Sequence, residues 1–255
     1  MRIVIKVGTS TLAHKTGKLN IRKTSQLCKV LSDLKNEGHE VVLVSSGAIG
    51  MGVGKLALSK KPTDIPTKQA AAAVGQCELM YTYDRLFTEY NHTVAQILLT
   101  GSDFSANDRH ENFNNTIKRL LELDVLPIIN ENDTIATEEI KVGDNDTLSA
   151  LVAVSVKADV LVLLSDVDGL YSADPKTCEN AQLLQEIHGV PDWAMEIAGG
   201  AGSELGTGGM KTKLNAAKIA TDANCDMVIA NGETPEVLYD IVSGATGNYT
   251  RFFAK

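Results

Sequence analysis

The sequence predicts an α/β fold, a three-layer α/β/α sandwich with a mostly parallel central sheet. Short apolar runs recur along the 255 residues, and each run is continuous rather than alternating, which is typical of parallel strands buried on both faces. Amphipathic helical patterns lie between the runs, and this alternation of strand and helix predicts helices on both faces of the sheet. No linker rich in proline, serine or glycine divides the chain, so we expect one domain over residues 1–255.

The predicted strands and helices follow one another in a regular order. Residues of a helix that lie three or four positions apart share a face, and four such apolar faces can be recognised. The strands are expected at 3–7, 41–44, 94–99, 125–129, 160–164 and 227–230. The helical faces are Ile21, Leu27, Cys28, Leu31 and Leu34; Ala70, Val74, Cys77, Met80 and Phe87; Leu148, Leu151, Val152 and Ser155; and Met210, Leu214 and Ala217.

Two polar stretches interrupt this order. Residues 131–142 are polar and partly β-branched, and we interpret them as a hairpin or loop over the strand ends. Residues 50–68 contain glycine, lysine and proline, and we expect them to form a mobile lid.

Composition limits the classes of function. The net charge of −8, from 24 basic and 32 acidic residues, argues against a surface that coats nucleic acid. No apolar stretch reaches the ~20 residues that a membrane span needs, and the amino terminus does not resemble a signal peptide. The four cysteines are far apart, which favours buried, reduced thiols over a metal or redox motif. We expect a cytoplasmic protein.

Polar motifs follow most of the predicted strands. In an open α/β sheet, ligands bind beyond the carboxyl ends of the strands. There the sequence concentrates glycines, hydroxyls, amides and carboxylates, and a further motif opens a predicted helix. The motifs are Lys6-Val-Gly-Thr-Ser10, Ser45-Ser-Gly-Ala-Ile-Gly50, Asn130-Glu-Asn-Asp-Thr134, Ser165-Asp-Val-Asp-Gly169 and, at the helix, Gly143-Asp-Asn-Asp146.

The segment Gly206-Thr-Gly-Gly-Met-Lys-Thr-Lys213 has the composition of a phosphate-binding loop. Its glycines let backbone amides approach an anion, and the helix that follows adds unpaired N–H groups and the positive end of its dipole. It does not follow the usual P-loop pattern. The sequence therefore indicates a different design of phosphate site.

Each motif also has a structural interpretation. Lys6 alone could extend to solvent, Ser45–Gly47 could cap a helix, and Asp144 and Asp146 could match a helix dipole. Asp168-Gly169 could be a plain turn. Because all these elements coincide at one edge of the sheet, independent capping is the weaker explanation.

Taken together, the motifs resemble those of the amino acid kinase family. The discriminating pair is Asp144-Asn-Asp146 followed by Gly208-Gly-Met-x-Thr-Lys-Leu214, and the resemblance covers the whole chain. It implies ATP-dependent phosphorylation of the side-chain carboxylate of L-glutamate, the first step of proline biosynthesis. Many relatives carry an additional C-terminal PUA domain of roughly a hundred residues, a typical domain size, and we expect this chain to lack it.

The resemblance also implies roles for individual residues. Lys6 and Lys213 would stabilise the transferring phosphoryl group, with Asp146 between them as the third catalytic residue. Asp133 would bind the α-ammonium group of glutamate, and Ser46, the Gly47 backbone and Asn145 its α-carboxylate. The ATP-binding residues would be Ser165, Asp166, Thr207, Gly208, Gly209, Met210, Lys211, Thr212 and Lys213.

The chemistry needs no general base. The nucleophile is a carboxylate with a reference pKa of ~4.3, which is already ionised at neutral pH. Mg²⁺ would neutralise the ATP phosphates, and Asp144 or Asp166 could hold it through water, but the sequence assigns no direct metal ligand. We expect the amino-terminal part of the domain to bind glutamate and the part from about residue 160 to bind ATP.

Other functions remain open. A kinase of the same family acting on aspartate, N-acetylglutamate or UMP differs in pocket shape, although residues 45–50 offer no basic group for the UMP phosphate. A non-catalytic sensor would require loss of a catalytic group, and Lys6, Asp146 and Lys213 are all present. The resemblance further implies feedback inhibition by proline and a homo-oligomer, a dimer or tetramer. The acidic net charge and the lack of a long apolar stretch argue against nucleic acid and membrane as partners.

Overall fold

A computed structural model describes residues 1–14, 18–136, 145–175, 177–198 and 209–255. It confirms the α/β sandwich. The strands are β1 (Arg2–Val7), β2 (Glu40–Ser45), β3 (Val94–Leu99), β4 (Leu126–Glu131), β5 (Val160–Ser165), β6 (Glu186–His188), β7 (Asp226–Asn231) and β8 (Tyr249–Phe253). The helices are α1 (Thr9–Leu12), α2 (Ile21–Asn36), α3 (Ala48–Lys55), α4 (Ile65–Thr88), α5 (Gly101–Ser105), α6 (Asn107–Glu122), α7 (Asn145–Ser155), α8 (Asp192–Ala198), α9 (Met210–Asp222) and α10 (Val237–Ser243).

The strands form one sheet in the order β3-β4-β2-β1-β5-β7-β8-β6. All neighbouring strands are parallel except β7 and β8, which are antiparallel. The chain moves from β1 to β2 on one side and continues from β5 to β7 on the other, so the order reverses at the β1–β5 pair. Such a reversal point is where open α/β sheets bind ligands. Lys6 lies there, level with Val44 of β2 and Leu163 of β5.

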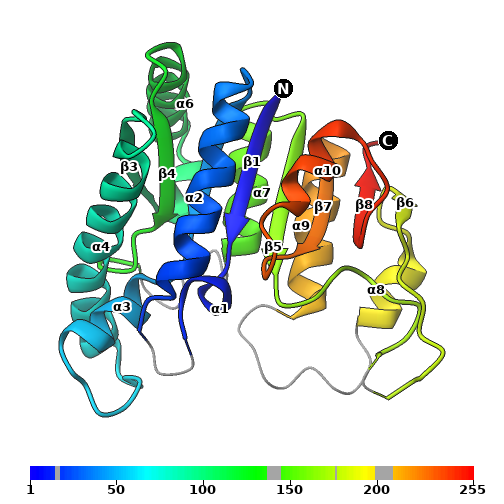
Figure 1. Ribbon diagram of the computed structural model, residues 1–255, viewed down its shortest axis with the longest axis horizontal. Coiled ribbons are helices and arrows are strands. Elements are labelled where there is room, and N and C mark those ends of the chain that lie inside the picture. The colour runs from blue at the N-terminus through cyan, green and yellow to red at the C-terminus, as the bar shows by residue number, and fades with distance from the viewer. Residues whose placement is uncertain (15–17, 137–144, 176, 199–208) are drawn as a thin grey trace.

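Two apolar layers separate the sheet from its helices. Helices α2, α4 and α10 pack on one face, and α6, α7 and α9 on the other (Figure 1). The central strands are buried on both faces, which explains why their sequences are continuously apolar. All six predicted strands are present. The sequence did not predict β6, β8 or α6.

The prediction of one polar lid over residues 50–68 is wrong in extent. Its first residues belong to α3 and its last to α4, so only 56–64 connects the two helices. A Cβ atom on Gly52 would lie 1.8 Å from the Ala71 carbonyl oxygen, and one on Gly75 would lie 1.7 Å from the Ala48 carbonyl oxygen. The glycines therefore serve close packing of α3 on α4 rather than a loop.

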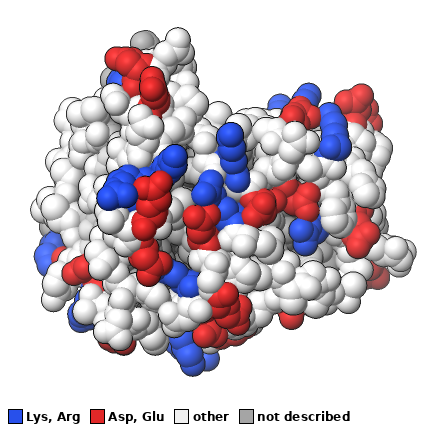
Figure 2. Space-filling model, turned by 90° about the horizontal axis from the view of Figure 1, so that it is seen from above, with Lys and Arg blue, Asp and Glu red and all other residues white. Residues whose placement is uncertain are grey.

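The face over the amino ends of the strands carries interspersed acidic and basic side chains (Figure 2). At these ends, Arg2 Nε lies 2.9 Å from Glu40 Oε2, joining the starts of β1 and β2. Within the described ranges, none of the helices combines the length and the apolar character that a bilayer crossing requires.

The cysteines only partly match the prediction of buried thiols. All four are free, and Cys28 and Cys225 are buried, but Cys77 is exposed and Cys178 is half-buried. Burial raises the pKa of the Cys225 thiol to about 12. Cys77 lies on the exposed side of α4.

Candidate active site

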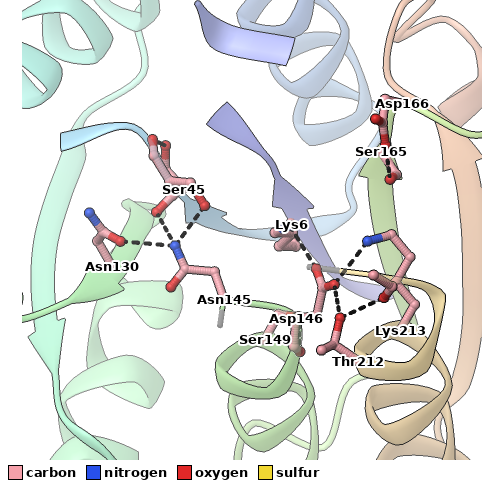
Figure 3. Close-up of polar contacts among 12 residues, drawn as sticks. Lys6, Ser45, Asn130, Asn145, Asp146, Ser149, Ser165, Asp166, Thr212 and Lys213 are labelled. Carbon is pink, nitrogen blue, oxygen red and sulfur yellow. Dashed lines mark hydrogen bonds and ion pairs between the residues drawn. The ribbon is translucent and has the colours of Figure 1, made fainter. Parts of the chain in front are cut away.

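Lys6, Asp146 and Lys213 meet at the carboxyl edge of the sheet. Lys6 Nζ lies 2.6 Å from Asp146 Oδ1, and Lys213 Nζ lies 3.0 Å from Asp146 Oδ2 (Figure 3). They come from the end of β1, the first turn of α7 and the first turn of α9. The side chains of Lys6 and Lys213 are 12% and 6% exposed, and Asp146 is fully buried. Two ammonium groups thus share one buried carboxylate.

The environment keeps Asp146 ionised. Burial alone would raise the pKa of its carboxyl group, but the charges of Lys6 and Lys213 outweigh it, so the pKa lies below the ordinary value. The bridging arrangement also limits the desolvation penalty of the two lysines, because each has an anionic partner.

The start of α9 adds a hydroxyl to this group. Thr212 Oγ1 donates to the Gly209 carbonyl oxygen at 2.7 Å and lies 3.2 Å from Asp146 Oδ2. Gly209 has extended backbone and precedes the helix, Met210 is half-buried and Lys211 is exposed. Thr207 and Gly208 lie outside the described residues, so their expected part in phosphate binding stays a prediction.

A second polar group lies beside the first one. Asn145 Nδ2 donates to Ser46 Oγ at 2.7 Å, and it lies 3.2 Å from both the Ser45 carbonyl oxygen and Asn130 Oδ1 (Figure 3). Gly47 follows with φ +105, which an L side chain rarely adopts, and is the N-cap of α3. Since Asn145 and Asp146 are consecutive, the first turn of α7 joins the two groups.

Ser165 and Asp166, which the sequence predicts to bind ATP, lie across Lys6 from Ser45 (Figure 3). Ser165 Oγ donates to Asp166 Oδ1 at 3.1 Å at the end of β5. Asp133 lies half-buried in the turn after β4. β4 and β5 flank β2 and β1 in the sheet, so all these residues lie along one edge.

A sequence profile of the amino acid kinase family matches residues 1–231, which includes every described residue of these groups. The chain belongs to the amino acid kinase family. It is 54% identical over 248 residues to glutamate 5-kinase of Clostridium perfringens (strain 13 / Type A), covering 95% of this chain and 92% of that one. It is 51% identical to glutamate 5-kinase of Caldanaerobacter subterraneus subsp. tengcongensis (strain DSM 15242 / JCM 11007 / NBRC 100824 / MB4), covering 96% of this chain and 66% of that one.

Two solved structures have the same fold at low sequence identity. Carbamate kinase from Giardia lamblia bound to AMP-PNP has a TM-score of 0.72 at 17% identity, covering 100% of this chain and 98% of that one. UMP kinase from Ureaplasma parvum has a TM-score of 0.65 at 17% identity, covering 99% of this chain and 98% of that one. At such identity they support the fold of the amino acid kinase family and nothing finer.

In this member of the amino acid kinase family, Asp168 and Gly169 of the turn after β5 make structural contacts. Asp168 accepts from Asn231 Nδ2 at 2.7 Å and from the Tyr171 hydroxyl at 3.0 Å, which ties the ends of β5 and β7 together. A Cβ atom on Gly169 would lie 2.2 Å from Thr250 Oγ1. The interpretation of Asp168-Gly169 as a plain turn therefore fits the contacts.

Sequence reasoning missed two residues at the site. Asn130 was recognised only as part of a strand-end motif, and Gln76 was not singled out at all. Asn130 Nδ2 donates to Gln76 Oε1 at 3.0 Å, and both residues are buried. No sequence signal connects position 76 to position 130, because the contact depends on how α4 packs against the sheet.

Proposed function

We propose that this chain transfers the γ-phosphoryl group of ATP to the side-chain carboxylate of L-glutamate, giving L-glutamyl 5-phosphate, the first step of proline biosynthesis. The observation that carries the proposal is the pair Lys6 and Lys213 on the buried Asp146 carboxylate. The glutamate 5-kinase relatives at 50–55% identity support the choice of substrate.

The main barrier to this reaction is repulsion between an anionic carboxylate and an anionic phosphoryl group. Catalysis of phosphoryl transfer relies on positioning and electrostatic stabilisation rather than on covalent chemistry. Lys6 and Lys213 would neutralise charge on the group in transfer from two sides. Asp146 is a positioning residue that holds both ammonium groups in place and remains ionised because its pKa is low.

The two charged groups of the amino acid need complementary partners. Asp133 would pair with the α-ammonium group. Ser46 would donate its hydroxyl hydrogen to the α-carboxylate, because Ser46 Oγ already accepts a hydrogen from Asn145. The Gly47 amide would provide a second donor. Glutamate would thus occupy the side of β2, β4 and α7, with ATP beside β5 and the start of α9.

Magnesium fits this donor set in a limited way. Mg²⁺ usually keeps several waters and takes one or two carboxylates together with phosphate oxygens. Asp166 offers one such carboxylate, and in the described part of the chain no group of three His, Cys, Asp or Glu side chains could hold the ion alone. When bound, Mg²⁺ neutralises charge on the ATP phosphates, and Asp166 would contact it through water.

A substrate panel tests the proposal. Purified protein, ATP and Mg²⁺ are incubated with L-glutamate, L-aspartate, N-acetyl-L-glutamate or UMP. Hydroxylamine traps acyl phosphates as hydroxamates, and ADP release detects transfer to any of the four. Hydroxamate from glutamate alone is the expected result, whereas a preference for another substrate would contradict the proposal.

Regulation and assembly follow from the same proposal. Proline carries the same α-carboxylate and a related ammonium group, so we expect it to compete with glutamate at the Ser46 and Asp133 side of the site. Inhibition by proline that added glutamate relieves, and added ATP does not, would support this competition.

We also expect a dimer or tetramer in solution, which light scattering after size-exclusion chromatography measures directly.

A further inference from the structure

Gln76 of α4 carries a buried amide group that packing alone does not explain. The residue is 7% exposed, its Oε1 accepts from Asn130 Nδ2 at 3.0 Å, and its Nε2 has no hydrogen-bond partner among the described residues. Its neighbours along the inner face of α4, such as Leu79 and Tyr83, are fully buried. A leucine or methionine would fill similar space without leaving a buried amide nitrogen unpaired.

The position of Gln76 next to the glutamate side follows from helix packing. Gly75 permits α4 to approach the first turn of α3, since a Cβ there would lie 1.7 Å from the Ala48 carbonyl oxygen. α3 begins directly after Ser46 and Gly47. The next residue of α4, Gln76, reaches the end of β4 through Asn130. Gln76 therefore directly follows the residue of α4 that packs against Ala48, two positions after Ser46.

Hydrogen bonds connect Gln76 to Ser46, and Asn145 donates in both directions, to Ser46 and to Asn130. Asn130 donates through Nδ2 to Gln76, and its Oδ1 accepts from the Glu131 amide at 2.9 Å and lies 3.2 Å from Asn145 Nδ2. Asn145 in turn donates to Ser46 Oγ (Figure 3). Because the Ser46 oxygen accepts in this arrangement, its own hydrogen is directed elsewhere.

We propose that Gln76 is a positioning residue for the acceptor substrate, acting through Asn130 and Asn145 on the hydroxyl of Ser46. This inference rests on the proposed function. Without the Gln76 acceptor, the buried Asn130 amide nitrogen loses its partner and turns to another one. Its oxygen then leaves Asn145 Nδ2, which moves towards the Ser45 carbonyl oxygen and weakens its hydrogen bond to Ser46 Oγ. The hydroxyl hydrogen of Ser46 is then no longer held towards the α-carboxylate of glutamate.

The test compares Gln76→Met with the unmodified chain and with Cys77→Ala, an exposed neighbour on the same helix. Turnover with varied glutamate and varied ATP gives both KM values, and thermal unfolding gives Tm. We expect Gln76→Met to raise the KM for glutamate about tenfold, the size of a lost hydrogen bond in a polar network. The KM for ATP should stay within about twofold, since the nucleotide side is untouched.

A double-mutant cycle separates this role from a structural one. In an Asn145→Ala background, Gln76→Met should change the glutamate KM no further, because the route to Ser46 is already broken. An additive effect, an unchanged glutamate KM or an equal rise in both KM values overturns the inference. Gln76→Leu replaces Gln76→Met if the latter does not fold.

The unmodified chain distinguishes the two levels of proposal. If it does not phosphorylate glutamate, the proposed function fails and this inference fails with it. If it does, and Gln76→Met lowers only Tm, the inference alone fails.

Discussion

Lys6 and Lys213, from the first strand and the last long helix, contact different oxygens of one carboxylate. The Nζ atoms lie 2.6 Å from Oδ1 and 3.0 Å from Oδ2 of Asp146, at a site where all three side chains are almost inaccessible to water. Two segments that are far apart in the sequence therefore meet at the single carboxylate of Asp146. Four predictions follow from this site and its supporting helices.

Removal of either ammonium group should abolish most of the activity without unfolding the protein. Lys6→Met and Lys213→Met should each lower kcat by about 10²-fold or more, as expected when a preorganised charge at a transition state is lost. Lys218→Met, an exposed lysine of α9, is the matched control and should keep normal turnover. Full turnover in either site variant would exclude a catalytic role for that lysine.

Asp146→Asn should weaken the fold in a way that depends on pH. The pKa of Asp146 is lowered in the folded protein. A carboxylate of this kind stabilises the fold above its unfolded pKa of about 3.9, and the contribution disappears as the pH falls towards the lower, folded value. At pH 7 the variant should lose about 3 kcal/mol of unfolding free energy, the lower end for breaking a buried pair.

Urea titrations of Asp146→Asn and the unmodified chain between pH 7 and pH 3 provide the measurement. The difference in unfolding free energy should be constant near neutrality and shrink below about pH 4. A difference that grows on acidification would mean that the carboxylate does not stabilise the folded state.

Asp133→Asn should act on one substrate only. It removes the proposed partner of the α-ammonium group, so the KM for glutamate should rise by about tenfold or more while the KM for ATP changes little. Glu122→Gln, at the end of α6, serves as a charge-matched control. A selective rise in the KM for ATP would mean that Asp133 acts on ATP and not on glutamate.

Gly52 and Gly50 should respond in opposite ways to alanine. A Cβ on Gly52 would collide with the Ala71 carbonyl oxygen, so Gly52→Ala should lower stability by about 1–3 kcal/mol. At Gly50 the nearest atom would be at 3.7 Å, and Gly50→Ala should be neutral or gain up to about 1 kcal/mol of helix propensity. Thermal unfolding of both variants gives the comparison, and similar losses in the two would argue against the close helix packing.

The central strands could be predicted because each one is marked by its own residues. Runs such as 160–164 are continuously apolar in the sequence, and the structure confirms them as strands. β6 has only three residues, and β8 contains Thr250 and Arg251, so neither shows a continuous apolar run. Helix α6 was missed because only Phe113 and Ile117 of its side chains are buried.

The site was predictable to the extent that each residue belongs to a motif. Lys6, Asp146 and Lys213 were expected together, and the structure brings them within contact distance. Gln76 lies in no motif, and its importance depends on a hydrogen bond to a residue of another element. The lid expected at 50–68 was wrong in extent because glycines that suggest a loop instead pack two helices tightly.

Asn145 and Asp146 are consecutive, and one faces the proposed glutamate side while the other holds the two lysines. Covalent geometry fixes their Cα atoms about 3.8 Å apart. Under the proposed function, the first turn of α7 would therefore join the residues that bind the α-carboxylate of glutamate to those that act on the phosphoryl group. An acceptor that is one methylene shorter would then present its side-chain carboxylate short of the two lysines.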